Sequence, residues 1–243
     1  MKKTIFKGMA TAMVTPMTPE GVDYEALGRF IDFQLESGIN ALVAVGTTGE
    51  SATLTPEERE KVIAFTIDRV AGRVPVIAGT GTNNTQHAVN FSVSAARAGA
   101  DALLVVTPYY NKATQNGLYQ HFMAVADAST VPVILYNVPG RTGCNLLPKT
   151  VARLAEHPNI AAIKEASGNV AQTVEILHLC GDKLDVYSGE DALTVAMMAM
   201  GAKGTISVLS NVIPAQAVAM TDACRAGDFR TAAKMQCDFL PLI

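Results

Sequence analysis

Short apolar runs alternate with longer amphipathic segments along the whole chain. The apolar runs are rich in Val, Ile, Leu and Ala, whereas the segments between them repeat their apolar positions with the period of a helix. The expected strands are residues 9–15, 39–46, 74–80, 100–108, 131–139, 160–167, 184–190 and 204–211. The clearest helical segments are residues 24–37, 56–71, 85–98 and 117–128. The pattern therefore predicts strands and helices in strict alternation.

This alternation predicts a barrel. Continuously apolar strands are typical of a parallel sheet covered by helices, and eight strand and helix units are the number that closes a TIM barrel. We therefore predict an α/β protein with a (β/α)8 TIM barrel. An open, doubly wound sheet is the alternative, but the Gly-x-Gly-x-x-Gly fingerprint that follows its first strand is absent here.

Local signals support the predicted boundaries. Thr55 precedes Pro56 and stands three residues before Glu58, which is the arrangement of a capping box with proline at the first helical position. With no linker-like stretch in its 243 residues, the chain is expected to form one barrel over residues 1–226. Residues 227–243 are expected to begin a C-terminal helical extension.

Composition narrows the class of protein. Hydrophobic residues make up 49% of the chain and charged residues 17%, which indicates a large buried core. The net charge is −3 and the basic residues are scattered, so we expect no nucleic-acid partner. No apolar run reaches the ~18 residues of a membrane span, so we expect no membrane partner either.

Cysteine and histidine spacing argues against metal sites and disulfides. Neither residue type shows ligand-like spacing, so we expect no metal. Widely spaced cysteines that form no Cys-x-x-Cys pair are typical of reduced thiols, which favours a cytoplasmic location. The residues concerned are Cys144, Cys180, Cys224, Cys237, His87, His121, His157 and His178.

Lys164 stands inside the apolar run of residues 160–167, where a charged group requires an explanation. Burial disfavours the ammonium form, so the pKa of such a lysine falls and more of the amine is free to form a Schiff base with a carbonyl. Two alternatives are open at this point. The side chain can extend to solvent from the strand end, or it can pair with a carboxylate.

Polar residues at the other strand ends favour a catalytic role for Lys164, because active sites of TIM barrels lie at the carboxyl ends of the strands. Thr47 and Thr48 lie in a glycine-rich turn whose amides and hydroxyls suit a small carboxylate. Tyr110 and Tyr136 offer phenols for proton transfer, and Arg141 can clamp a second carboxylate. Taken singly, each of these residues can also be explained without a catalytic role, as a residue of a turn, of the core or of the surface.

Together these residues carry a family resemblance. The motifs are Gly46-Thr47-Thr48-Gly49-Glu50, Tyr109-Tyr110-Asn111, Tyr136-Asn137-Val138-Pro139-x-Arg141-Thr142-Gly143, Ile163-Lys164-Glu165-Ala166 and Ser188-Gly189. From about Phe6 onward the chain resembles the dihydrodipicolinate synthases, which are pyruvate-dependent class I aldolases. The resemblance implies the Schiff-base condensation of pyruvate with L-aspartate 4-semialdehyde to 4-hydroxy-tetrahydrodipicolinate. This lyase reaction needs no cofactor and is the first committed step of lysine biosynthesis by the diaminopimelate route.

The resemblance also implies roles for individual residues. Lys164 forms the imine, and Tyr136 moves protons to and from it. Thr47 and Thr48 hold the pyruvate carboxylate, with Thr47 linking Tyr136 to Tyr110. The backbone of Ile206 contacts pyruvate, Gly189 leaves room for substrate, and Arg141 receives the carboxylate of the aldehyde. Tyr110 reaches into the site of a neighbouring subunit, which implies a homo-oligomer, either a dimer or a tetramer.

Two other functions are compatible with parts of this pattern. Sialic-acid lyases share the lysine and the tyrosine, but they usually carry Ser-Thr in place of Thr47-Thr48 and lack an arginine at position 141. A barrel that binds pyruvate or a protein partner without catalysis is the second alternative. It arises because family members usually continue beyond residue 243, so the C-terminal helical extension is expected to be truncated.

Feedback inhibition by lysine is a separate question raised by the resemblance. Ser51, Ala52, Asn83 and Tyr109 match the positions that bind lysine in inhibited family members. Pro56, Arg59 and His87 depart from that pattern, and the loss of an acidic contact at His87 argues against inhibition of this protein.

Overall fold

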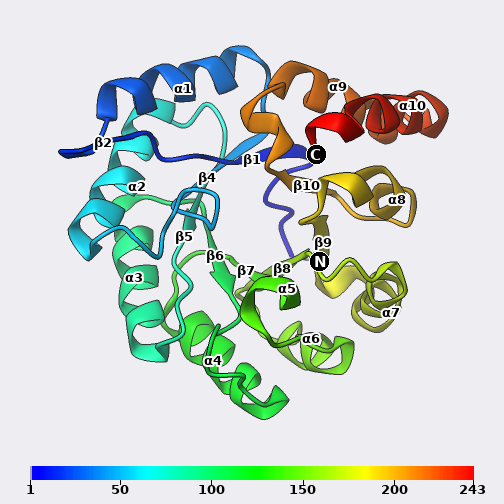
Figure 1. Cartoon of the computed structure of the whole chain (residues 1–243). Coiled ribbons are helices and arrows are strands. Elements are labelled where there is room, and N and C mark those ends of the chain that lie inside the picture. Colours follow the sequence, from blue (N-terminus) through cyan, green and yellow to red (C-terminus); the bar gives the residue numbers. More distant parts are fainter. Residues whose placement is uncertain (1) are drawn as a thin grey trace.

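The computed structural model describes residues 2–243 and shows eight parallel strands that close into a barrel surrounded by helices (Figure 1). Each strand pairs with its neighbour in the chain, and β1 closes the ring against β10, so the predicted TIM barrel is confirmed and the open sheet is wrong. The barrel strands are β1 (Gly8–Ala12), β4 (Ala41–Ala44), β5 (Val76–Gly79), β6 (Ala102–Val106), β7 (Val133–Asn137), β8 (Ile160–Glu165), β9 (Asp185–Ser188) and β10 (Gly204–Ser207).

Helices cover the outside of the barrel. The α-helices are α1 (Tyr24–Glu36), α2 (Pro56–Val70), α3 (Thr85–Ala98), α4 (Gln115–Ala128), α5 (Pro139–Thr142), α6 (Pro148–Leu154), α7 (Val170–Cys180), α8 (Thr194–Ala199), α9 (Pro214–Arg225) and α10 (Phe229–Phe239). The 3-10 turns are η1 (Gly181–Lys183), η2 (Asp191–Leu193), η3 (Leu209–Asn211) and η4 (Leu240–Leu242). A small hairpin of β2 (Met17–Thr18) and β3 (Gly21–Val22) was not predicted.

No helix among the described residues is both long and apolar enough to cross a bilayer.

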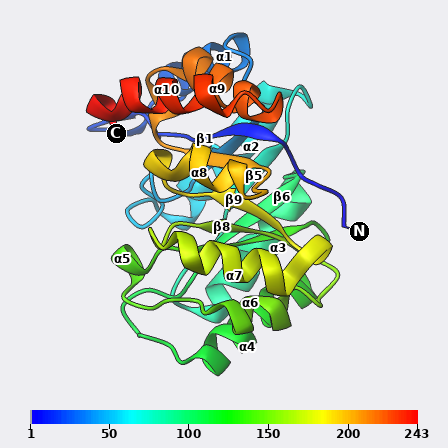
Figure 2. The same ribbon diagram turned by 90° about the vertical axis from the view of Figure 1, so that its right-hand side faces the viewer.

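The C-terminal helices pack on one side of the barrel. Figure 2 shows α9 and α10 next to each other, with α8 nearby. The side chain of Gln236 on α10 accepts a hydrogen bond from the amide of Val195 and donates one to the carbonyl of Ala192. The expected division between residues 226 and 227 falls in the turn between α9 and α10.

The observed strands are shorter than the predicted ones, mostly at their carboxyl ends. The run 131–139 is a strand only over Val133–Asn137, because Pro139 begins α5. The run 204–211 is a strand only over Gly204–Ser207, after which the backbone turns into η3. These residues leave the ladder to form the rim of the barrel, so apolar character alone overestimated the strand lengths.

Local capping signals were more accurate. Thr55 forms the expected capping box, since its hydroxyl accepts a hydrogen bond from the amide of Glu58 at 3.2 Å. The Glu58 carboxylate in turn accepts one from the amide of Thr55 at 2.8 Å. This confirms the predicted start of α2 at Pro56.

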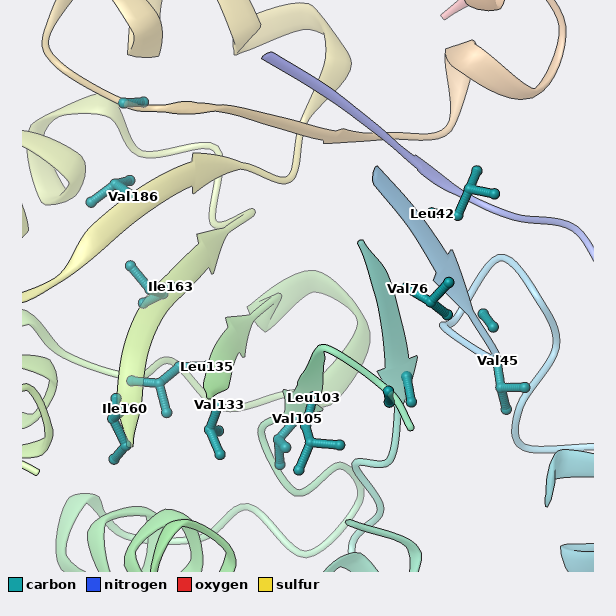
Figure 3. Packing of buried hydrophobic residues seen from close by; sticks show 14 of the residues in the cluster. Leu42, Val45, Val76, Leu103, Val105, Val133, Leu135, Ile160, Ile163 and Val186 are labelled. Atoms are coloured by element: carbon teal, nitrogen blue, oxygen red, sulfur yellow. The ribbon is translucent and has the colours of Figure 1, made fainter. Parts of the chain in front are cut away.

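The strands bury side chains on both faces. Figure 3 shows side chains from neighbouring strands, such as Leu135, Ile163 and Val186, in the cluster between the barrel and its helices. The alternate positions point into the barrel, where Ala162, Ile134 and Ile206 belong to a separate interior cluster. The interior is therefore packed with side chains, as in other TIM barrels.

Two aromatic rings close the amino end of the barrel. Phe6, just before β1, stacks on Tyr187 with ring centroids 4.2 Å apart and planes 6° from parallel. The Tyr187 hydroxyl donates a hydrogen bond to the carbonyl of Phe6 at 2.8 Å. Both side chains are buried, so this end of the barrel interior is filled.

His121 on α4 is a buried titratable group outside the barrel interior. Its Nδ1 lies 2.9 Å from the Thr85 hydroxyl, while its Nε2 has no hydrogen-bond partner among the described residues. Burial lowers the pKa of His121 to about 4, so the folded protein holds this imidazole neutral where the unfolded chain protonates it.

We predict that His121 makes the protein less stable in acid. Its folded pKa lies below its unfolded value, so its protonation opposes folding as the pH falls from about 6.5 towards 4, by at most about 3 kcal/mol. His121→Gln should reduce the loss of thermal stability between pH 7 and pH 4.5, measured by circular dichroism melts. His178→Gln on the exposed face of α7 is the control and should leave that loss unchanged. Equal pH dependence in wild type and His121→Gln would contradict the prediction.

Candidate active site

Lys164 is buried at the carboxyl end of β8. Every residue of this strand is buried, and Lys164 itself is only 4% exposed. Its Nζ lies 4.4 Å from the centroid of the Tyr136 ring and makes no hydrogen bond or ion pair with any described residue. Both alternatives raised from the sequence, exposure at the strand end and pairing with a carboxylate, are therefore wrong.

Burial lowers the pKa of Lys164 to about 8. The negative charges of Asp191 and Glu190 act in the opposite direction, while the positive charge of Arg141 adds to the effect of burial. A lysine with this pKa is a free amine in an appreciable fraction of molecules near neutral pH, so it can act as a nucleophile.

Strand register explains why Lys164 meets aromatic residues. Lys164 is paired with Tyr136 on β7 and with Tyr187 on β9, so these three side chains stand on neighbouring strands at one level. All three are buried. The Tyr187 ring, however, stacks on Phe6 at the amino end of the barrel, so the ring that lies against the amine is that of Tyr136.

Tyr136 is the phenol closest to the amine in this arrangement. Burial raises the pKa of Tyr136, whereas the positive charge of Arg141 and the Thr47 hydroxyl act in the opposite direction. The phenol is therefore protonated near neutral pH and can donate a proton to, or relay one from, a group bound at Lys164.

The turn after β4 is tightly built and presents free backbone amides. A Cβ at Gly79 would lie 2.1 Å from the carbonyl oxygen of Val45, and one at Gly49 would lie 3.0 Å from that of Met13. Val45 itself has a φ of +57°. The amides of Thr47 and Thr48 have no acceptor among residues 2–243. Such amides, together with the threonine hydroxyls, form a cradle for a small carboxylate.

A cavity of about 370 Å³ joins these elements at the carboxyl end of the barrel. We call it the Lys164 cavity. It brings together six of the eight residues expected from the sequence: Lys164, Tyr136, Thr47, Thr48, Arg141 and Gly189. Val138, Ala166, Glu190, Asp191, Val208 and Ile243 complete its lining. The exposed guanidinium of Arg141 pairs with no described carboxylate and is free to bind an anion at the mouth.

The other two expected residues do not line the Lys164 cavity. The side chain of Ile206 is fully buried in the barrel interior, so only its backbone on β10 is near the rim. The ring of Tyr110 is 88% exposed, and its backbone has a φ of +70°, in the left-handed region. Tyr110 therefore projects away from the barrel of its own chain.

A buried polar network behind the cavity was missed from the sequence. The Glu165 carboxylate accepts hydrogen bonds from the Ser167 amide at 2.7 Å, from Asn137 Nδ2 at 3.0 Å and from Gln172 Nε2 at 3.2 Å. These bonds tie the ends of β7 and β8, which carry Tyr136 and Lys164 at the preceding positions. A glutamate directly after the lysine in an apolar strand is the signal that could have revealed it.

Gly189 is in direct contact with the Lys164 side chain. A Cβ at position 189 would lie 2.8 Å from Cε and 2.9 Å from Cγ of Lys164, and 2.7 Å from Cβ of Ala166. Its amide donates a hydrogen bond to the carbonyl of Glu165 at 2.8 Å. Glycine is therefore required here because Lys164 occupies the space of a side chain.

Comparison with known proteins relates the chain to one enzyme family. The sequence profile of the dihydrodipicolinate synthetase family matches residues 5–243. A 4-hydroxy-tetrahydrodipicolinate synthase from Geobacter sulfurreducens is 54% identical over 238 residues, which cover 98% of this chain and 82% of the relative. The protein of the same name from Geotalea uraniireducens is 56% identical over 228 residues, covering 94% of this chain and 79% of the relative.

A solved structure agrees with the sequence matches. The crystal structure of dihydrodipicolinate synthase from Aquifex aeolicus is similar with a TM-score of 0.96 and 47% sequence identity. The match covers 98% of this chain and 81% of that chain. The barrel of the present chain is thus shared with this enzyme over nearly all of its residues.

We predict that Gly189→Ala destabilises the protein. The added methyl group has to displace Lys164 or Ala166, and overpacking of this kind costs about 1–3 kcal/mol. In a chain of this size the melting temperature should fall by roughly 2–4 °C per kcal/mol. Gly140→Ala on α5 is the matched control, because a Cβ there meets no atom within 4 Å. Equal melting temperatures for the two variants would show that Gly189 is not constrained by Lys164.

Proposed function

We infer that this chain, which belongs to the dihydrodipicolinate synthetase family, condenses pyruvate with L-aspartate 4-semialdehyde to form 4-hydroxy-tetrahydrodipicolinate. This lyase reaction is the first committed step of lysine biosynthesis by the diaminopimelate route. The observation that carries the assignment is the buried Lys164 amine, with its lowered pKa, beside the phenol of Tyr136.

The first half of the reaction builds the nucleophile. The neutral amine of Lys164 attacks the keto carbon of pyruvate, and the resulting hydroxyl group leaves as water once it is protonated, which gives an iminium ion. In this mechanism Tyr136, whose ring centroid lies 4.4 Å from the amine, supplies and removes the protons of these steps. Thr47 and Thr48 hold the pyruvate carboxylate through their free amides and hydroxyls, and the backbone of Ile206 contacts pyruvate from β10.

The second half forms the carbon–carbon bond. Loss of a methyl proton from the iminium gives an enamine, whose carbon attacks the aldehyde carbon of the second substrate. Arg141, which lines the mouth of the Lys164 cavity, binds the carboxylate of that substrate. The substrate amine then attacks the imine carbon and releases Lys164 as a free amine, which closes the ring. Gly189, a small residue that lines the cavity beside Lys164, completes the substrate-binding residues.

We further propose that Tyr110 acts across a subunit interface in a homo-oligomer, either a dimer or a tetramer. Its ring is exposed and held on a left-handed backbone, outside the cavity of its own chain. An exposed tyrosine on a strained backbone is typical of a residue with a partner, since strain is tolerated where function requires it. In this arrangement Thr47 links Tyr136 to Tyr110 of a neighbouring subunit.

Cell location and chain organisation complete the proposal. The four cysteines are all free, and reduced thiols are characteristic of the cytoplasm, where we place the enzyme. We assign residues 1–226 to the barrel and 227–243 to a C-terminal helical extension, whose α10 packs on α8 and α9.

Trapping with pyruvate tests the proposed function. Incubation with pyruvate and borohydride should add one pyruvate-derived group to Lys164, because reduction converts the imine to a stable secondary amine. Peptide mass spectrometry locates the adduct. Lys164→Arg should abolish it, while Lys61→Arg on the exposed face of α2 should not. An unmodified Lys164 in the wild-type protein would rule out the covalent mechanism.

Arg141→Ala should separate the two substrates. The variant keeps the amine and the carboxylate cradle, so the pyruvate adduct should still form. The loss of a charge-assisted contact with the aldehyde carboxylate should lower kcat/KM for aspartate semialdehyde by roughly 10- to 100-fold. Turnover of sialic acid by the wild type, or an unchanged kcat/KM in the variant, would favour a different aldolase. An adduct without any condensation in the wild type would favour a barrel that only binds pyruvate.

A further inference from the structure

Asp191 is a buried carboxylate of the Lys164 cavity to which neither sequence reasoning nor the proposed mechanism gives a role. It is the first residue of η2, follows the carboxyl end of β9 and is 8% exposed. It lines the cavity together with Lys164, although the two side chains are not in direct ion-pair contact. A buried acid at this place requires an explanation, since an isolated buried charge is costly.

One oxygen of the Asp191 carboxylate is explained by hydrogen bonds from the backbone that follows β10. Asp191 Oδ2 accepts hydrogen bonds from the amide of Val208 at 2.8 Å and from the amide of Leu209 at 3.0 Å. These amides belong to the turn that follows Ile206 and Ser207. The carboxylate therefore ties the end of β9 to the end of β10, which is where the backbone contact to pyruvate is expected.

The second carboxylate oxygen of Asp191 has no structural role of this kind. Asp191 Oδ1 is buried and has no hydrogen-bond partner among the described residues. A side chain needed only to hold two amides does not require a second, unpartnered and negatively charged oxygen. An asparagine would hold both amides with its carbonyl and carry no charge.

We propose that Asp191 is a positioning residue with an electrostatic role: it fixes the β10 rim and supplies the buried negative charge that balances the iminium formed at Lys164. The proposal rests on the proposed function, because the iminium arises only if Lys164 reacts with pyruvate. The iminium needs such a charge more than the amine does. The free amine escapes the cost of burial by losing its proton, whereas the reactive protonated imine remains positive.

The charges around Lys164 single out Asp191. Arg141 on the neighbouring α5 is positive and opposes a cation, while Tyr136 on β7 and Tyr187 on β9 are neutral phenols with raised pKa values. Glu190 is also negative, but it is less buried than Asp191, so water screens its charge more strongly. Of the two carboxylates whose charges act on the amine, Asp191 is thus the better shielded from water.

The variant Asp191→Asn removes the negative charge of the side chain but keeps its hydrogen bonds to the β10 rim. The amide carbonyl can still accept from Val208 and Leu209, so the variant should fold with a melting temperature close to that of wild type. Asp191→Ser, whose hydroxyl can also accept an amide hydrogen bond, is a second charge-free variant. Asp191→Glu keeps the charge. Asp182→Asn removes one charge from η1, at the opposite end of β9, and is the matched control.

The measurement is the rate of pyruvate adduct formation at Lys164 in the presence of cyanoborohydride, followed by mass spectrometry from pH 6 to pH 10. In wild type the rate should rise with a midpoint near pH 8, the pKa of the amine. Removing a negative charge disfavours the ammonium form, so Asp191→Asn should move the midpoint to lower pH by about half a unit to one unit. At pH 9.5, where the amine is free in every variant, the half-saturating pyruvate concentration should rise about tenfold, because the iminium has lost its counter-charge.

The outcomes distinguish this proposal from its premise. Absence of an adduct in wild type contradicts the proposed function itself. A wild-type adduct with the same midpoint and half-saturation in Asp191→Asn and Asp191→Ser overturns the role of Asp191. Equal shifts in Asp182→Asn overturn it as well, since they would reflect net charge rather than a local effect. A wild-type midpoint in Asp191→Glu together with shifted midpoints in the charge-free variants supports it, because a purely structural role would move the melting temperature and not the pH profile.

Discussion

The removal of the Lys164 amine from water is the constraint on which the rest of the site depends. A strand whose residues are all buried places the amine where its charged form is disfavoured, and this lowers its pKa towards neutrality. Every neighbouring feature is compatible with that burial. The Tyr136 ring lies 4.4 Å from the amine, and the absence of a side chain at Gly189 leaves space for the lysine. A carboxylate in hydrogen-bond contact would have restored the ammonium form and removed the nucleophile.

The acidic groups near Lys164 are held in ways that respect this constraint. Glu165, the next residue along β8, points away from the barrel interior, and neutral donors satisfy its carboxylate. Asp191 faces the cavity but directs one oxygen to two backbone amides and stays outside ion-pair distance. The amine can therefore be neutral before the reaction, while negative charge is still available nearby once a cation has formed. In the proposed mechanism the same arrangement thus serves both the nucleophilic amine and the iminium.

Sequence reasoning identified the fold and most of the Lys164 cavity because both depend on local signals. The alternation of apolar runs determined the barrel, and the rule that strand ends face one rim brought Thr47, Tyr136, Arg141 and Lys164 together. Three structural features could not be predicted from the sequence. Strand lengths were overestimated, since apolar rim residues such as Val138 resemble strand residues until the turn is seen. The pairing of Tyr136 with Lys164 depends on the stagger of the closed barrel, which no single strand encodes. Asp191 was overlooked because its role comes from amides seventeen and eighteen residues further along the chain.

The stacked rings of Phe6 and Tyr187 have a consequence for the order of events in each catalytic cycle. Because they fill the amino end of the barrel, the Lys164 cavity lies on the opposite, carboxyl side of these rings. In the proposed mechanism both substrates then enter, and the product leaves, from the carboxyl side. Pyruvate has to arrive first in that mechanism, because the enamine that attacks the aldehyde forms from it at Lys164. The stacked rings thus make the amino end a solid base, so that arrival and departure of both substrates are confined to one side of the barrel.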